Sequence, residues 1–305
     1  MKIIKRFLQE EYPFIFAAPA LVWQLIFLYF PLIAIIFFSF FDFSAITGFL
    51  QWTLSHYINV FKPVYIKVIT NSFVLACITS IICLLIAYPV AYFLSFKVKR
   101  FKAFWIFALV LPSWTNLIVQ IYAWFFLLEK RGLISQLLYR IGVLSKPDHL
   151  MNNYFATLLG MVYCFLPFMI LPIYTILEKM DRRLIEASAD LGANQFRSFK
   201  KIILPISLPG IYTGLLLVFI PSFGEFVIPM VLGGAKRAYW GTVIVDKFLV
   251  AGDWRSGFAL ASVGIFFLVS VFSIFYFLLK ITETIRQRRL QEKCEKNKNS
   301  FLGER

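Results

Sequence analysis

The segment EASADLGANQFRSFKKIILP, residues 186–205, interrupts a strongly apolar chain with acids, bases, amides and a glycine. Within it and just before it, four residues fall at positions i, i+3, i+4 and i+7: Leu184, Ala187, Ser188 and Leu191. This spacing places them on one face of a short helix. Because residues 187–189 are all small, another protein could approach this helix closely.

The residues around this helix predict where it begins and ends. Asp181 can cap its start, and Gly192 can end it by adopting a positive φ. Asn194 can cap a second helix, which we expect Pro205 to stop. The second helix has three apolar residues on one face: Phe196, Phe199 and Ile203. We therefore expect two short amphipathic helices joined by a sharp turn.

The composition of the chain is that of a polytopic membrane protein. Of its 305 residues, 60% are hydrophobic, 19% aromatic and only 15% charged, whereas a soluble domain carries about 25% charged residues. The net charge of +15 comes from short basic clusters between apolar stretches, a pattern typical of membrane topology rather than of nucleic-acid binding. The four cysteines show no spacing that indicates a disulfide or a metal site.

Six stretches are long and apolar enough to be membrane helices. They cover residues 14–41, 69–95, 103–128, 154–177, 206–231 and 257–280. The first is too long for a signal peptide, and no clear cleavage site follows it, so we expect it to be retained.

The basic residues predict the orientation of these spans. The 31 lysines and arginines divide about two to one between alternate loops, and the richer side faces the cytoplasm by the positive-inside rule. Both termini and the 186–205 segment are then cytoplasmic. The loops near 42–68, 129–153 and 232–256 face outward.

Several of the predicted spans contain proline: Pro89, Pro112, Pro167, Pro172, Pro221 and Pro229. Each proline removes a backbone donor and tends to kink its helix, and in lipid the freed carbonyls need other partners. Kinked spans can line a cavity that opens and closes, or they can serve packing alone. The sequence leaves both interpretations open.

An apolar ridge beside the membrane needs a cover, and either a groove in a partner protein or lipid headgroups could supply it. Here the sequence resembles the EAA signature of ABC importer permeases. The matching residues are Glu186, Ala187, Ser188, Gly192, Ile202, Leu204 and Pro205. Ser188 stands where that signature has a second alanine. The resemblance favours docking to a protein and implies that residues 178–205 form the coupling loop to a cytoplasmic ATPase, with Glu186 as a polar contact.

Further stretches resemble the spermidine/putrescine permease family, specifically the first of the two permeases in that system. They are NSFVLACITSIICLLIAYPVAYFLS at 71–95, LPSWTNLIVQIYAW at 111–124, LPFMILPIYTILEKMDRRLIEASADLGA at 166–193, VLGGAKRAYWGTVI at 231–244 and GDWRSG at 252–257. The resemblance implies an all-α integral membrane protein of six transmembrane helices with the type I, MetI-like permease fold. It divides the chain into a cytoplasmic N-terminus (1–12), a permease domain (13–281) and a basic cytoplasmic tail (282–305).

The resemblance also implies the partners of the chain. These are a second permease subunit, an ATPase dimer that binds ATP and Mg, and a periplasmic polyamine-binding protein, all at a bacterial inner membrane. The sequence contains no GxxxxGK[ST] motif and no nucleophile–base pair. We therefore expect no catalytic residue, metal or cofactor on this chain, and we expect membrane lipid, but no nucleic acid, among its contacts.

A path for a polyamine needs hydrogen-bond acceptors and aromatic faces, because aromatic rings attract ammonium groups. In the third predicted span, polar residues and tryptophan repeat along one helical face: Ser113, Asn116, Gln120 and Trp124, with Trp114 beside them. Such a stripe can line a cavity or can form hydrogen bonds between helices. Both interpretations stay open.

Glu225 is the carboxylate that we place within a span, between Pro221 and Pro229. An ionisable group in a membrane is a functional candidate, and Ser222 lies one helical turn before it. We expect Glu225 to face the translocation path and to bind an ammonium group. The alternative is a carboxylate near the outer surface that pairs with Lys236 or Arg237.

Other functions fit the same sequence less well. The same importer could carry another cationic metabolite, iron or a sulfonate. An ion-coupled secondary transporter would show inverted repeats and several charges within its spans, and an intramembrane enzyme would show a catalytic pair. The basic tail could be a solvated extension or could touch anionic lipid.

Overall fold

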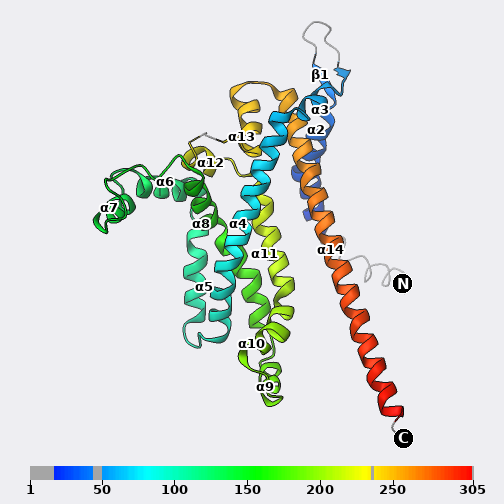
Figure 1. Ribbon diagram of the computed structural model, residues 1–305. Helices are drawn as coiled ribbons and strands as arrows, with labels where there is room; N and C mark the ends of the chain where they lie inside the picture. The colour runs from blue at the N-terminus through cyan, green and yellow to red at the C-terminus, as the bar shows by residue number, and fades with distance from the viewer. Residues whose placement is uncertain (1–16, 44–49, 235–236, 304–305) are drawn as a thin grey trace, which may run out of the picture. The chain divides into compact units, whose positions relative to one another are not determined.

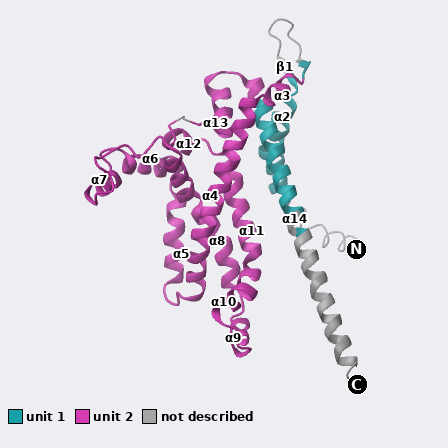
Figure 2. Cartoon of the chain, in the orientation of Figure 1, with its two compact units in different colours: residues 1–53, 258–305 teal, residues 54–257 magenta. Residues whose placement is uncertain are grey.

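The computed structural model describes residues 17–43, 50–234 and 237–303. Within these ranges the chain is almost entirely helical. It divides into two compact units, residues 1–53 with 258–305 and residues 54–257 (Figure 2). The predicted N-terminal segment 1–12 lies outside the described residues.

The first unit contains an apolar helix that runs from Ala17 to Phe38. It passes through a π-helical turn, η1 (Leu25–Tyr29), into α2 (Phe30–Phe38). The last helix, α14 (Trp254–Gly303), begins in the second unit and continues through the first. The predicted basic tail 282–305 thus continues the last helix as far as Gly303.

A short hairpin follows α2 and is the exception to an all-helical chain in the described part. Strand β1 (Phe41–Phe43) pairs antiparallel with β2 (Leu50–Trp52), and Phe41 lies opposite Trp52. The Trp52 ring stacks on Phe40 at 5.1 Å and meets the edge of Phe41 at 5.6 Å. Such aromatic cross-strand contacts stabilise a hairpin that the surrounding loop sequence did not predict.

Three long helices form the core of the second unit: α4 (Pro63–Phe96), α8 (Tyr154–Glu178) and α11 (Leu204–Gly224). They lie side by side and pack pairwise (Figure 1). Glycines on α11 allow the closest approach to α8. A Cβ at Gly210 would lie 2.8 Å from the Pro172 carbonyl oxygen, and one at Gly214 would lie 2.7 Å from the Met169 sulfur. Small residues at this spacing bring membrane helices close enough for their backbones to pack.

Two pairs of short helices lie at opposite ends of this bundle (Figure 1). One end carries α9 (Arg183–Asp190) and α10 (Gln195–Ser198), which η3 (Phe199–Ile203) joins to α11. The other end carries α12 (Val227–Leu232) and α13 (Trp240–Val245), with η4 (Asp246–Val250) after them. Helix α3 (Ser55–Val60) precedes α4.

The third predicted span, 103–128, is not one continuous helix, and it breaks just after Pro112. Helix α5 (Lys102–Val110) and the 3-10 turn η2 (Leu111–Trp114) are followed by α6 (Leu117–Leu128) and α7 (Leu133–Arg140). The chain bends by 91° between the two halves, and α6 and α7 extend sideways from the bundle (Figure 1). Five helices in the described chain are long and apolar enough to cross a membrane, and the bent pair makes a sixth if it counts as one span.

The fifth predicted span, 206–231, also differs from the structure. The helix starts earlier, at Gln195, and ends at Gly224. Glu225 has an extended backbone (φ −66°, ψ 132°), which separates α11 from α12. Proline alone does not explain the break, because Pro209 and Pro221 both lie inside α11 without ending it.

Candidate functional site

The coupling segment, residues 178–205, folds largely as its turn residues predict. Gly192 has a φ of +75°, which confirms its role in ending α9. The Asn194 side chain accepts a hydrogen bond of 2.8 Å from the Arg197 N–H and so caps α10. The Asp181 carboxylate accepts one of 3.0 Å from the Arg183 N–H at the start of α9. These side chains satisfy donors that a helix start leaves without partners.

The prediction that Pro205 stops the second helix is wrong. The helix that begins at α10 continues through η3 into α11, and Pro205 lies in the first turn of α11. In η3 the Leu204 N–H bonds to the Phe199 carbonyl, five residues earlier. Proline is tolerated in a first helical turn because its missing N–H would have no partner there. The π-helical turn just before it shifts the backbone pairing to carbonyls five residues earlier, so the helix continues past Pro205.

Ser188 joins the two short helices. Its hydroxyl lies 2.7 Å from the hydroxyl of Ser198, and the side chain is buried at 8% exposure. The alanine of the EAA signature could not make this hydrogen bond. The departure at Ser188 therefore adds a link between α9 and α10.

The apolar residues predicted to share a face separate into two groups. Leu191 and Phe196 are 89% and 73% exposed, and Leu184 is also exposed. Phe199, by contrast, packs edge-on against Tyr88 of α4 at 5.7 Å between ring centroids. No described part of the chain covers the exposed ridge of Leu184, Leu191 and Phe196, while Phe199 anchors the segment to the bundle.

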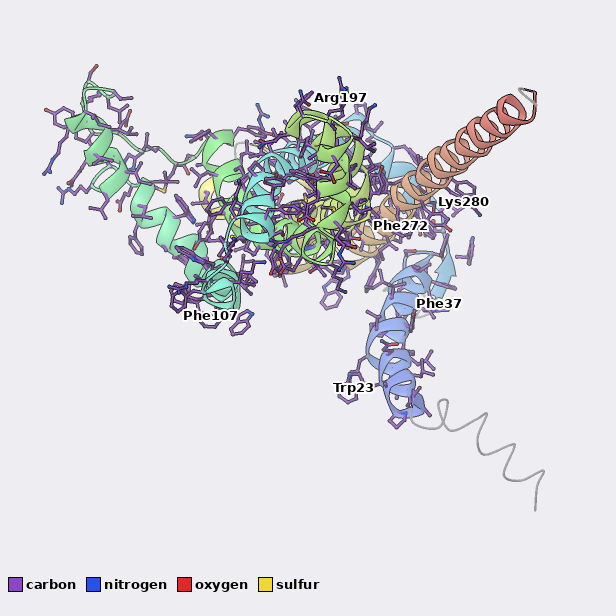
Figure 3. The ribbon with its side chains drawn as sticks, turned by 90° about the horizontal axis from the view of Figure 1, so that it is seen from below. Trp23, Phe37, Phe107, Arg197, Phe272 and Lys280 are labelled. Carbon is purple, nitrogen blue, oxygen red and sulfur yellow. The ribbon has the colours of Figure 1, made fainter. Side chains whose placement is uncertain are left out.

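The remaining signature residues lie around this ridge. Glu186 and Ala187 are exposed on α9, while Ile202 and Leu204 are half-buried where η3 meets α11. Figure 3, which looks at this end of the bundle, places Arg197 at its rim. The arrangement is an apolar ridge with a carboxylate and flanking basic groups.

The predicted polar stripe of the third span does not exist as one helical face, because the helix breaks between Trp114 and Leu117. The Ser113 hydroxyl bonds back to the Val110 carbonyl at 2.6 Å. Asn116 caps α6 by accepting a hydrogen bond of 2.8 Å from the Ile118 N–H. Both side chains build the bend.

Gln120 closes the bend from the other side. Its amide nitrogen donates to the carbonyls of Pro112 at 2.6 Å and Thr115 at 3.0 Å. Its oxygen lies 3.6 Å from the Cys164 sulfur on α8. Of the two interpretations of the stripe, hydrogen bonding that holds the helices together fits Gln120.

The two tryptophans of this region differ in their surroundings. Trp114 is 72% exposed and meets the edge of Phe107 at 5.8 Å, and Figure 3 shows Phe107 at the outer edge of the unit. Trp124 is half-buried and packs edge-on against Tyr163 at 5.3 Å.

Glu225 lies half-buried at the break between α11 and α12. Its Oε1 accepts hydrogen bonds from the N–H groups of Val227 at 2.8 Å and Ile228 at 3.3 Å, so it caps α12. Oε2 has no hydrogen-bond partner among the described residues. Ser222, one turn earlier, is buried, and its hydroxyl is likewise without a partner in the described chain.

The alternative that Glu225 pairs with a nearby cation finds no support in the described residues. The Arg237 guanidinium lies over the Tyr154 ring, 5.0 Å from its centroid, and Lys236 lies outside the described residues. Because α12 packs against both α6 and α8, the structure brings Glu225 and Gln120 to the same corner of the unit.

Sequence reasoning missed the contacts that hold the segment after α12. The Ser72 hydroxyl of α4 accepts a hydrogen bond of 2.7 Å from the Trp240 N–H, and the Asn71 amide donates to the Ala238 carbonyl at 3.3 Å. Two adjacent polar residues in an apolar span were the available signal. In the described chain, no three His, Cys, Asp or Glu side chains are grouped so as to hold a metal ion.

Known proteins resemble this chain in sequence. It is 41% identical over 225 residues to spermidine/putrescine transport system permease protein PotB of Haemophilus influenzae, covering 74% of this chain and 78% of that protein. It is 36% identical over 240 residues to PotB of Escherichia coli, covering 78% and 86%. It is 32% identical over 210 residues to the inner membrane ABC transporter permease protein YdcU of E. coli, covering 65% and 66%. No family model matches the chain.

Solved structures share the fold. A bacterial ABC transporter involved in the import of alginate superimposes with a TM-score of 0.69 at 18% identity, covering 90% of this chain and 96% of the other. The same kind of transporter, in complex with an alginate pentasaccharide-bound periplasmic protein, gives a TM-score of 0.68 at 17% identity. These likenesses confirm the permease fold.

Proposed function

This chain belongs to the family of spermidine/putrescine transport permeases, and from that premise we propose that it moves polyamines across a bacterial inner membrane. The observation that supports this most strongly is the 41% identity to a PotB protein, spread over most of both chains. The chain is a multi-pass membrane protein of the permease type. It forms part of the path for the substrate, and a partner protein supplies the free energy of ATP hydrolysis.

The partner that we propose for the coupling segment is an ATPase dimer. The exposed ridge of Leu184, Leu191 and Phe196 suits insertion into a groove of another protein. Glu186 is exposed on α9, two residues after Leu184, and can form an ion pair with a cationic side chain of the partner. ATP and Mg would bind to the partner, since this sequence has no GxxxxGK[ST] motif.

The rest of the machine follows from the family. We propose a second permease subunit beside this one, a periplasmic polyamine-binding protein on the outer side, and lipid around the exposed apolar helices. Both termini and the coupling segment then face the cytoplasm. ATP-driven movement of α9 and α10 would rock the long helices between inward-open and outward-open states.

We propose that the substrate passes Glu225. One carboxylate oxygen caps α12, and the other is left to accept from an ammonium group. The half-buried setting strengthens such a charged contact, because little water competes for it. Trp114 before the bend and Trp124 on α6 are the aromatic candidates, and Ser222 offers a hydroxyl. Ser113, Asn116 and Gln120 would then shape the path rather than contact the polyamine.

The test is uptake of radiolabelled spermidine by cells that express this chain with its neighbouring genes. Glu225→Gln keeps the cap on α12 but removes the charge. Since a hydrogen bond to a charged group contributes about 1.5–3 kcal/mol, we expect the apparent affinity for spermidine to fall about 10- to 100-fold. Glu129→Gln, another carboxylate change near the bent pair, is the control.

Two results would contradict this proposal in different ways. Unchanged uptake in Glu225→Gln removes Glu225 from the path. An assembled wild-type complex that takes up neither spermidine nor putrescine keeps the permease assignment and discards the polyamine substrate. Where the complex transports spermidine, Gly192→Asp, which places a carboxylate in the coupling turn, should abolish uptake.

A further inference from the structure

The carbonyl of Ser95 is a meeting point for two cationic side chains. Ser95 lies in the last turn of α4 and is only 1% exposed. Its carbonyl oxygen accepts hydrogen bonds from Lys102 Nζ at 3.2 Å and from Arg182 Nη2 at 3.0 Å. Lys102 begins α5, and Arg182 directly precedes α9. The end of α4 is therefore tied both to the next helix and to the coupling segment.

The chemistry of a helix end explains why cations gather here. The last carbonyls of a helix have no partner within it and carry a partial negative charge, which attracts lysine and arginine. Lys102 is balanced by Glu178 at the end of α8, with both carboxylate oxygens at 2.7 Å. Arg182 has the Phe96 ring at 6.0 Å as its second contact.

We propose that Arg182 is a positioning residue, which holds the start of α9 against the end of α4. The coupling segment is joined covalently to α8 and α11 alone, so α4 and α5 can follow its movement only through non-covalent contacts. Arg182 supplies one such contact. Phe199 supplies another on the far side of the segment, through Tyr88 at 5.7 Å and Tyr92 at 6.3 Å between ring centroids. The inference rests on the proposed docking of an ATPase at α9.

This role concerns position rather than stability. Arg182 is exposed, and exposed charged contacts contribute little to the free energy of unfolding. A variant of Arg182 should therefore fold and assemble. The variant should instead weaken the contact through which a movement of α9 displaces the end of α4.

The first test measures amide hydrogen exchange across α9 and across the turn 97–101 in the assembled transporter, with no substrate present. Arg182→Gln should accelerate exchange in both segments at least several-fold. Arg183→Gln removes the same charge from the neighbouring exposed position and should leave exchange unchanged. Equal exchange in wild type and Arg182→Gln would overturn the proposal, and so would equal acceleration in the two variants.

The second test measures ATP hydrolysed per spermidine transported in proteoliposomes. Arg182→Gln should raise this ratio several-fold while the rate of ATP hydrolysis is kept, and Arg182→Lys should restore part of the coupling. An unchanged ratio in Arg182→Gln overturns the proposal. If wild type hydrolyses ATP but moves no spermidine, the substrate assignment fails, and the exchange measurement still decides the role of Arg182.

Discussion

Gly192 shows at the scale of a single residue how a turn was predicted and why it matters. Its φ of +75° is a left-handed conformation that residues with a Cβ rarely adopt, yet a Cβ there would meet nothing within 4 Å. The requirement for glycine is therefore conformational and not one of space. That separates it from Gly210, whose Cβ would meet backbone of α8.

We predict that Gly192→Ala lowers uptake and that Gly192→Asn lowers it less. A left-handed conformation costs about 1–2 kcal/mol for most residues, whereas asparagine adopts it more readily. Spermidine uptake by the assembled complex measures the effect. Gly142→Ala is the matched control, since Gly142 has a φ of +78°, also with nothing within 4 Å, far from the coupling segment in sequence. Equal losses in the two alanine variants would contradict a specific role for the 192 turn.

Ser188 provides a second prediction at this scale. Ser188→Ala should destabilise the packing of α9 on α10 by about 0.5–1.5 kcal/mol, because one buried hydrogen bond is lost. A double-mutant cycle with Ser198→Ala, read by amide exchange of α9, isolates the pair. A coupling energy near zero would mean that the 2.7 Å contact contributes nothing. Uptake should persist, since the EAA signature has alanine at this position.

At the scale of elements, the bent pair α5–α6 depends on side chains that replace backbone partners. At the 91° bend the Pro112 carbonyl accepts from the Thr115 N–H and hydroxyl, and the Gln120 amide donates to the carbonyls of both Pro112 and Thr115. Within a membrane, freed carbonyls must be satisfied inside the protein. The bend is therefore held by a polar side chain in an apolar helix.

We predict that Gln120→Leu lowers the melting temperature of the purified complex. The Pro112 carbonyl keeps its Thr115 donors, but the Thr115 carbonyl loses the Gln120 donor, and leaving a polar group without a partner inside a protein costs about 1–3 kcal/mol. Gln136→Leu is the control, since Gln136 also bonds a backbone carbonyl, that of Arg131 at 3.0 Å, but at an exposed position on α7. A melting temperature as high as that of the control would show that lipid or water satisfies the Thr115 carbonyl instead.

At the scale of the whole molecule, orientation in the membrane is the property on which the proposed docking depends. The described part of the chain has free cysteines at Cys77, Cys83 and Cys164, of which the last two are buried. Cys294 lies in the basic tail. The native chain thus carries a thiol suited to a test of which side the tail faces.

We predict that a membrane-impermeant maleimide labels the chain in inside-out vesicles and leaves it unlabelled in intact spheroplasts. Cys294→Ser should abolish the labelling in vesicles. Labelling of Cys294 in spheroplasts would place the tail outside. Two spans, Gln195–Gly224 and Trp254–Phe277, lie between the coupling segment and the tail. The coupling segment would therefore lie outside as well.

The sequence by itself determined the features that depend on neighbours along the chain. Apolar length predicted where the spans lie, though not the break in the third or the ends of the fifth. The spacing of Glu186, Gly192 and Pro205 indicated the permease family, and Gly192 and Asn194 predicted their turn and cap. Each of these follows from local conformational preference or from a short repeat, which a sequence displays directly.

The tertiary structure alone decided where backbone groups find their partners. Pro205 does not stop its helix, because a π-helical turn rearranges the carbonyls before it. The third span bends after Trp114, and Gln120 holds the bend by donating to the carbonyls of Pro112 and Thr115. Arg182 meets Ser95 across 87 residues of sequence. From the sequence, a proline shows only that a backbone donor is missing, and a charged residue shows only that a donor or acceptor is available. The packing of distant helices determines which hydrogen bonds form.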